Sequence, residues 1–121
     1  MKVDVGAAGE LDDGRFKVVE IRGREVGVIR WRGRFYAVSN VCPHMGGPVC
    51  GDLIPKIVSP TGAPGELAVE EEVPVIVCGW HSQEFDARTG RSLTPEAARL
   101  RTYRTEVVDG RVLVDLRASA A

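Results

Sequence analysis

Alternating apolar and polar positions predict short β-strands toward both ends of this chain. On the N-terminal side, residues 16–21, 25–30 and 34–38 read as a three-stranded meander with turns at residues 22–24 and 32–33. On the C-terminal side, residues 100–108 and 111–116 read as a hairpin around Asp109-Gly110, a pair that suits positive-φ turns. Trp31, Phe35, Tyr36 and Val38 are expected as sheet and core residues, because aromatic and β-branched side chains favour half-buried pleated surfaces.

The middle of the chain is less regular. Residues 73–77 form an apolar run that predicts a buried strand, and residues 85–86 predict a short strand followed by a turn at 87–90. Residues 94–98 suggest one helical turn. Before these segments, residues 54–58 and 66–69 suggest a small hairpin leading to an acidic tip formed by Glu66 and residues 70–72. These carboxylates would steer a basic partner, although a solvated face is the commoner explanation of such a run.

Composition and charge narrow the class of protein. The chain has 121 residues, which favours a single domain, with 44% hydrophobic and 27% charged residues. The 16 Lys and Arg against 17 Asp and Glu give a net charge of -1, which offers no support for nucleic-acid binding. No run approaches the roughly 20 apolar residues of a membrane span, and the first residues lack the apolar core of a secretion signal. We therefore expect a cytoplasmic protein, in which cysteines more often bind metal than form disulfides.

Two short motifs carry the candidate chemistry. Cys42-Pro43-His44 and Cys78-Gly79-Trp80-His81 contain both histidines of the chain and two of its three cysteines. Thiolate and imidazole ligands suit zinc or an iron–sulfur centre rather than calcium or magnesium. One Cys and one His in each motif match a Rieske [2Fe–2S] site, where two cysteines hold one iron and two histidines the other. The alternative is a Cys₂His₂ zinc module used for protein interaction, which would be colourless where an iron–sulfur protein is reddish-brown.

The residues around the ligands resemble the Rieske-type ferredoxin family. Residues 42–48 resemble its first cluster-binding loop, and residues 78–81 with Phe85-Asp86 and Thr89-Gly90 resemble its second. The resemblance implies an all-β Rieske fold, with an antiparallel β-sandwich base and a small cluster-binding subdomain of two loops. The base would hold residues of about 1–39 and 91–121, and the subdomain about 40–90 with an extended insertion at 51–73. It also implies Cys42, His44, Cys78 and His81 as ligands of a Rieske-type [2Fe–2S] cluster.

The resemblance further implies a one-electron carrier between a flavin-dependent reductase and a terminal oxygenase, with no catalytic residue of its own. No histidine remains for the mononuclear iron of an oxygenase, so the chain is not expected to be the oxygenase itself. A small subunit docked to a larger redox enzyme, such as a nitrite reductase, is the alternative role. Cys50 is interpreted as a small buried residue rather than a ligand.

Neighbouring positions indicate a low reduction potential. High-potential relatives carry a disulfide between the two loops, and the corresponding positions here hold Gly47 and Trp80. Gln83 and Phe85 stand where those relatives use serine and tyrosine hydroxyls to bond sulfur. With fewer donors to stabilise added negative charge, we predict a potential of about -150 mV, the low end of the Rieske range. Ser82 stands where the family usually has glycine, and a positive φ there would strain it.

Overall fold

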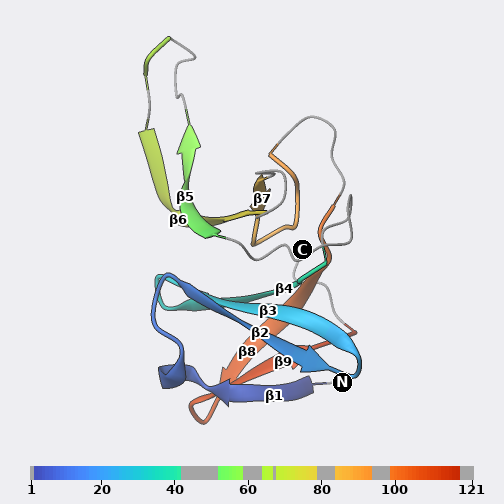
Figure 1. The fold of residues 1–121 in the computed structure, drawn as a ribbon. Coiled ribbons are helices and arrows are strands. Elements are labelled where there is room, and N and C mark those ends of the chain that lie inside the picture. Colours follow the sequence, from blue (N-terminus) through green and yellow to red (C-terminus); the bar gives the residue numbers. More distant parts are fainter. Residues whose placement is uncertain are drawn as a thin grey trace.

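The computed structural model describes residues 2–41, 52–58, 64–66, 68–78, 84–93 and 99–117, which form two antiparallel sheets (Figure 1). The larger sheet has six strands in the order β1-β9-β8-β4-β3-β2, and the smaller has the order β5-β6-β7. The elements in chain order are β1 (Lys2–Ala7), a 3₁₀ turn (Ala8–Glu10), β2 (Arg15–Ile21), β3 (Arg24–Trp31), β4 (Arg34–Ser39), β5 (Asp52–Val58), β6 (Ala68–Val77), β7 (Glu84–Asp86), β8 (Thr102–Val108) and β9 (Arg111–Asp115). This confirms the predicted all-β class.

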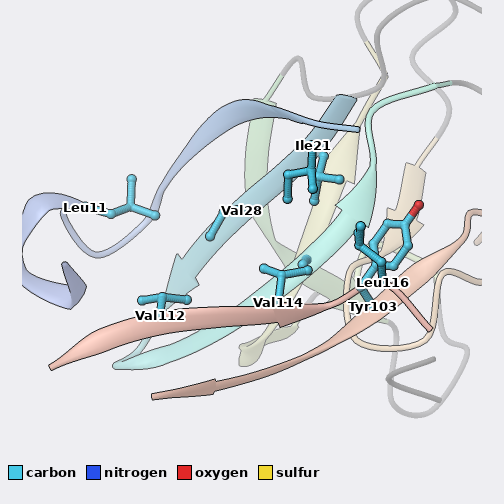
Figure 2. Packing of buried hydrophobic residues seen from close by; sticks show 9 residues of the cluster. Leu11, Ile21, Val28, Tyr103, Val112, Val114 and Leu116 are labelled. Atoms are coloured by element: carbon cyan, nitrogen blue, oxygen red, sulfur yellow. The ribbon is translucent and has the colours of Figure 1, made fainter. Parts of the chain in front are cut away.

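The six-stranded sheet, which we call the base, curls over a shared apolar core (Figure 2). Every strand of the base contributes a side chain to this core, because alternate residues of each strand point to the same face. Its buried members are Leu11, Ile21, Val26, Val28, Ala37, Tyr103, Val112, Val114 and Leu116.

Three two-residue turns join neighbouring strands of the base, and all three were expected from the sequence. Arg22-Gly23 has φ values of 53° and 79°, Arg32-Gly33 has 50° and 77°, and Asp109-Gly110 has 50° and 74°. Positive φ at both central residues is the signature of the turn whose twist matches a β-hairpin. The predicted strands on either side are confirmed within one or two residues.

Strand β1 was not identified from the sequence. It pairs with β9 from Lys2↔Asp115 to Ala7↔Arg111, with an irregularity between Asp4 and Gly6. Val3 and Val5 pack against the base core, while Lys2 and Asp4 face outward and form ion pairs. The alternation was therefore present, but it covers too few residues to separate a strand from an ordinary chain end.

The small sheet corrects the expected position of the acidic residues. A hairpin does form, but it joins the whole of β5 to β6, and Glu70, Glu71 and Glu72 lie within β6 rather than at a tip. Pro55 pairs with Pro74, and the next pair is Lys56 with Glu70, so residues 71–73 have no partner on β5. Two facing prolines cannot donate ladder hydrogen bonds, which explains a bulge at this point.

A second apolar cluster joins the two sheets. Ile29 and Val38 of the base meet Ile76 and Phe85 of the small sheet, all four fully buried. Trp31 and Tyr36 pack against this cluster and Phe35 against the base core, which confirms their predicted role in the packing. Within the residues described, no helix is long and apolar enough to cross a membrane. The helical turn predicted at 94–98 lies outside these residues.

Candidate metal centre

Strand β6 delivers Cys78, one of the four predicted ligands, to a buried position. The four residues Val73, Pro74, Val75 and Ile76 are buried along this strand, as the apolar run predicted. Cys78 follows Val77 directly, has 1% of its surface exposed and belongs to the cluster between the sheets. Its thiol is not in a disulfide. The other predicted ligands, Cys42, His44 and His81, lie outside the described residues, as do Cys50, Gly47, Trp80, Ser82 and Gln83.

The small sheet brings three of the four borders of the ligand segments to one end. Asp52, the first residue of β5, pairs with Val77, and Val77 pairs with Glu84, the first residue of β7. The chain therefore enters the small sheet at Asp52, beside the points where it leaves the sheet after Val77 and returns at Glu84. Adjacent strands lie about 4.8 Å apart, so these borders fall within about 10 Å of one another.

The strand that follows the second ligand segment is held on both faces. Phe85 has 0% exposure and packs beside Cys78, in the cluster between the sheets. Asp86 is buried and accepts hydrogen bonds from the backbone N–H of Arg88 at 2.9 Å and from its guanidinium at 3.0 Å and 3.2 Å. The hydrogen bond to Asp86 raises the pKa of Arg88 above its ordinary value. Sequence reasoning recognised Phe85-Asp86 as a motif but did not identify this pairing.

Gly90 closes the turn after β7 in a way that only glycine allows. Its φ is 77°, and a Cβ there would lie 1.9 Å from the carbonyl oxygen of Leu100. The Leu100 N–H donates to the Gly90 carbonyl at 2.8 Å, and the Gly90 N–H donates to the Asp86 carbonyl at 2.7 Å. The Thr89-Gly90 part of the motif therefore places β7 against the segment that leads back to the base.

A polar contact between distant residues also holds the small sheet to the base. The Trp31 indole Nε1 donates to the Glu71 carbonyl oxygen at 2.6 Å, and the Arg32 guanidinium pairs with the Glu71 carboxylate. Glu71 lies in the bulge of β6, and Arg32 in the β3–β4 turn. One of the predicted steering carboxylates is therefore engaged within the molecule. No local signal reveals this, because the partners are 39 and 40 residues apart.

What is described of the site fits a Rieske cluster. Residues 2–41, 52–58, 64–66, 68–78, 84–93 and 99–117 contain no group of three or more His, Cys, Asp or Glu that could hold a metal. Cys78 supplies a thiol shielded from water, among apolar side chains of both sheets. Such a shell suits a thiolate ligand of an iron–sulfur centre, because it limits the access of solvent and tunes the potential.

Comparisons with known proteins agree with this arrangement. The family model described as "Rieske [2Fe-2S] domain" matches residues 1–104. The ferredoxin component of the alkene monooxygenase system of Xanthobacter autotrophicus is 30% identical over 112 residues, covering 93% of this chain and 79% of that protein.

Two solved structures have similar folds. The ferredoxin of carbazole 1,9a-dioxygenase from Nocardioides aromaticivorans superimposes with a TM-score of 0.70 and 25% identity, covering 94% of this chain and 96% of that one. A putative NADH-dependent nitrite reductase small subunit from Mycobacterium tuberculosis gives a TM-score of 0.71 at 24% identity, with 94% and 93% covered, which is a likeness of fold alone. With a buried thiol where both ligand segments meet the small sheet, the chain belongs to the Rieske [2Fe–2S] domain family, whose cofactor is a Rieske-type [2Fe–2S] cluster.

Proposed function

We propose that this chain is a one-electron carrier whose Rieske-type [2Fe–2S] cluster is held by Cys42, His44, Cys78 and His81. The observation that carries the proposal is the pairing of Asp52, Val77 and Glu84 at one end of the small sheet. It sets the C-terminal border of the first ligand segment beside both borders of the second, next to the buried thiol of Cys78. A cluster bound there accepts and releases a single electron without any bond chemistry on a substrate.

The partners proposed are a flavin-dependent reductase as donor and a terminal oxygenase as acceptor. Support comes from the relatives, which are named as ferredoxin components of a monooxygenase system and of a dioxygenase. Two exposed apolar side chains border the ligand segments, which suits transient docking of a protein. Val41, 46% exposed, precedes Cys42, and Leu93, 39% exposed, donates its N–H to the Glu84 carbonyl at 2.9 Å.

Three further features belong to the same proposal. The chain has no catalytic residue of its own and works in the cytoplasm, where thiols remain reduced before the cluster is inserted. Residues of about 1–39 and 91–121 form the base of a single domain, and about 40–90 form the cluster-binding part with its insertion at 51–73. The reduction potential lies near the low end of the Rieske range, at about -150 mV.

The test is purification of the chain with iron and acid-labile sulfide analysis, followed by visible and electron paramagnetic resonance spectroscopy. We expect two irons per chain, a reddish-brown colour that fades on reduction, and a potential of about -150 mV. A colourless protein containing zinc would overturn the electron-carrier proposal in favour of an interaction module. A clearly positive potential would contradict only the predicted potential.

Matched cysteine variants test the ligand assignment. Cys78→Ser and Cys42→Ser should abolish the visible absorption of the cluster, whereas Cys50→Ser should leave it unchanged. Loss of the cluster in Cys50→Ser with retention in Cys42→Ser would show the assignment to be wrong. Size-exclusion of a native extract then distinguishes a freely diffusing carrier from a permanently docked subunit, because only the carrier elutes at the size of the chain alone.

A further inference from the structure

A hollow in the base is lined by four arginines. It has a volume of about 420 Å³, and its lining residues are Arg22, Arg24, Arg101, Leu116 and Arg117. They come from the β2–β3 turn, the start of β3, the residue before β8 and the residues after β9. The curl of the base brings these separate segments together, so no local run of basic residues reveals the hollow in the sequence.

The positive charge of the hollow is mostly uncompensated. All four arginines are exposed, and in the part of the chain that the structure describes no ion pair joins Arg24, Arg101 or Arg117 to a carboxylate. The Arg101 guanidinium donates to the Leu116 carbonyl at 3.4 Å and lies 5.3 Å from the centre of the Tyr103 ring. Neither contact neutralises its charge.

Two carboxylates are neighbours in the chain of residues that line the hollow, and both accept hydrogen bonds. Asp115 accepts a hydrogen bond at 2.9 Å from the Arg117 backbone N–H. Glu25, next to Arg24, accepts one at 3.3 Å from the Asn40 side-chain amide. Four arginines against these two carboxylates leave the surface around the hollow positive, although the whole chain has a net charge of -1.

The hollow adjoins the segment that leads to the first ligand. The Ser39 N–H donates to the Arg101 carbonyl at 2.8 Å, and the Asn40 N–H donates to the Glu25 carbonyl at 2.9 Å. Asn40 stands two positions before Cys42 in the chain. A protein bound at the arginines would therefore lie close to the start of the cluster-binding part.

We propose that this arginine hollow docks a carboxylate-rich segment of a redox partner. Exposed ion pairs are individually weak because water screens them, so one small anion gains little at such an open surface. A segment with several carboxylates adds several weak pairs, and complementary charge also speeds and orients the encounter of two proteins. This proposal rests on the proposed electron-transfer function in one respect: it takes the docked protein to be a redox partner.

The test uses the purified holoprotein and a fluorescein-labelled hexaglutamate peptide, with binding followed by fluorescence anisotropy at low ionic strength. Arg22→Asp suits the positive-φ turn, since Asp109 occupies the equivalent place in the β8–β9 turn. Combined with Arg117→Glu, it should weaken peptide binding about tenfold. The matched control for Arg22→Asp alone is Arg15→Asp, which makes the same change of charge at an exposed arginine at the opposite end of β2 and should have little effect.

Each alternative outcome has a defined meaning. Equal weakening by Arg15→Asp, or no binding by the unchanged protein, would overturn the docking site. Inorganic pyrophosphate binding more tightly than the peptide, and lost in the same double variant, would make the hollow a small-anion site and also overturn the proposal. The visible spectrum and its fading with dithionite should be the same in all variants. A protein without a cluster would refute electron transfer but leave the peptide result standing.

Discussion

The base and the small sheet bury their apolar side chains in different ways. The base has a core of its own, to which all six strands contribute. The small sheet packs its buried residues, among them Ile76, Cys78 and Phe85, against Ile29 and Val38 of the base. Its three strands gain their stability from this shared cluster, because a sheet of this size buries little surface alone. The part of the molecule that carries Cys78 is therefore the part that depends most on long-range contacts.

Of the substitutions considered, removal of the Phe85 side chain should have the largest effect on the stability of the small sheet relative to the base. Phe85→Ala leaves a cavity between the sheets and should lower the free energy of unfolding by about 3–5 kcal/mol. We expect loss of the cluster absorption at a temperature where the base still gives a folded far-ultraviolet circular dichroism spectrum. The control, Val114→Ala in the base core, should cost about 2 kcal/mol and lose both signals together. A single common transition in Phe85→Ala would show that the two sheets unfold as one unit.

Gly90 and Gly65 have nearly the same φ but different surroundings. Substituting each by alanine therefore distinguishes the cost of backbone strain from the cost of a steric clash. Gly90→Ala forces a Cβ toward the Leu100 carbonyl at a φ of 77°, so it should destabilise the protein by about 2–5 kcal/mol. Gly65→Ala has a φ of 79° and no neighbour within 4 Å of its new Cβ, so only the backbone term of about 1–2 kcal/mol remains. Urea denaturation measures both. Equal losses would mean that the chain near Leu100 moves away at little cost.

The contact between Trp31 and Glu71 should have a smaller effect. Trp31→Phe removes the indole donor while keeping an aromatic ring, and should lower the free energy of unfolding by about 1 kcal/mol. Arg32→Gln removes an ion pair whose side chains are 49% and 64% exposed, so its effect should lie within about 0–1 kcal/mol. The rate of hydrogen exchange of the β6 amides should rise more in Trp31→Phe than in Arg32→Gln. The reverse order would assign the attachment of the small sheet to the ion pair.

Low pH should slightly destabilise the six-stranded base sheet through Asp4. Hydrogen bonds from the Arg111 guanidinium, and then from the Gly6 N–H, hold the pKa of this carboxyl below its ordinary value of 3.8. Because the folded-state pKa is lower than the unfolded one, the stabilisation is present above about pH 4 and is lost as the pH falls through the folded pKa. In Asp4→Asn, the melting temperature should fall less steeply with decreasing pH over this range.

The control for Asp4 is Asp12→Asn, in the loop between the 3₁₀ turn and β2. Within the described residues the Asp12 carboxylate makes no hydrogen bond or ion pair, whereas the Asp4 carboxylate binds Arg111 at 3.0 Å. Asp12→Asn should leave the acid dependence as it is in the unchanged protein. If both substitutions flatten it equally, the effect belongs to the net charge and not to the Asp4 contact.

The sequence by itself determined the local structure of this protein. Two-residue turns such as Asp109-Gly110 and the alternation of the flanking strands predicted the hairpins of the base, since turn chemistry and side-chain period act over a few residues. The apolar run at 73–77 predicted the buried strand that ends at Cys78. The Cys and His motifs predicted the family and its cofactor, because few metal centres use that pattern of ligands.

Tertiary structure alone decided how distant segments meet. The pairing of Asp52, Val77 and Glu84, the attachment of Glu71 to Trp31 and Arg32, and the arginine hollow all join residues far apart in the chain. Such contacts depend on sheet register and curl, which are set by the packing of both cores at once and leave no periodic signal in any one segment. For the same reason Glu71 and Glu72, expected at a tip, lie instead in the bulge of β6 between the Pro55–Pro74 and Lys56–Glu70 pairs.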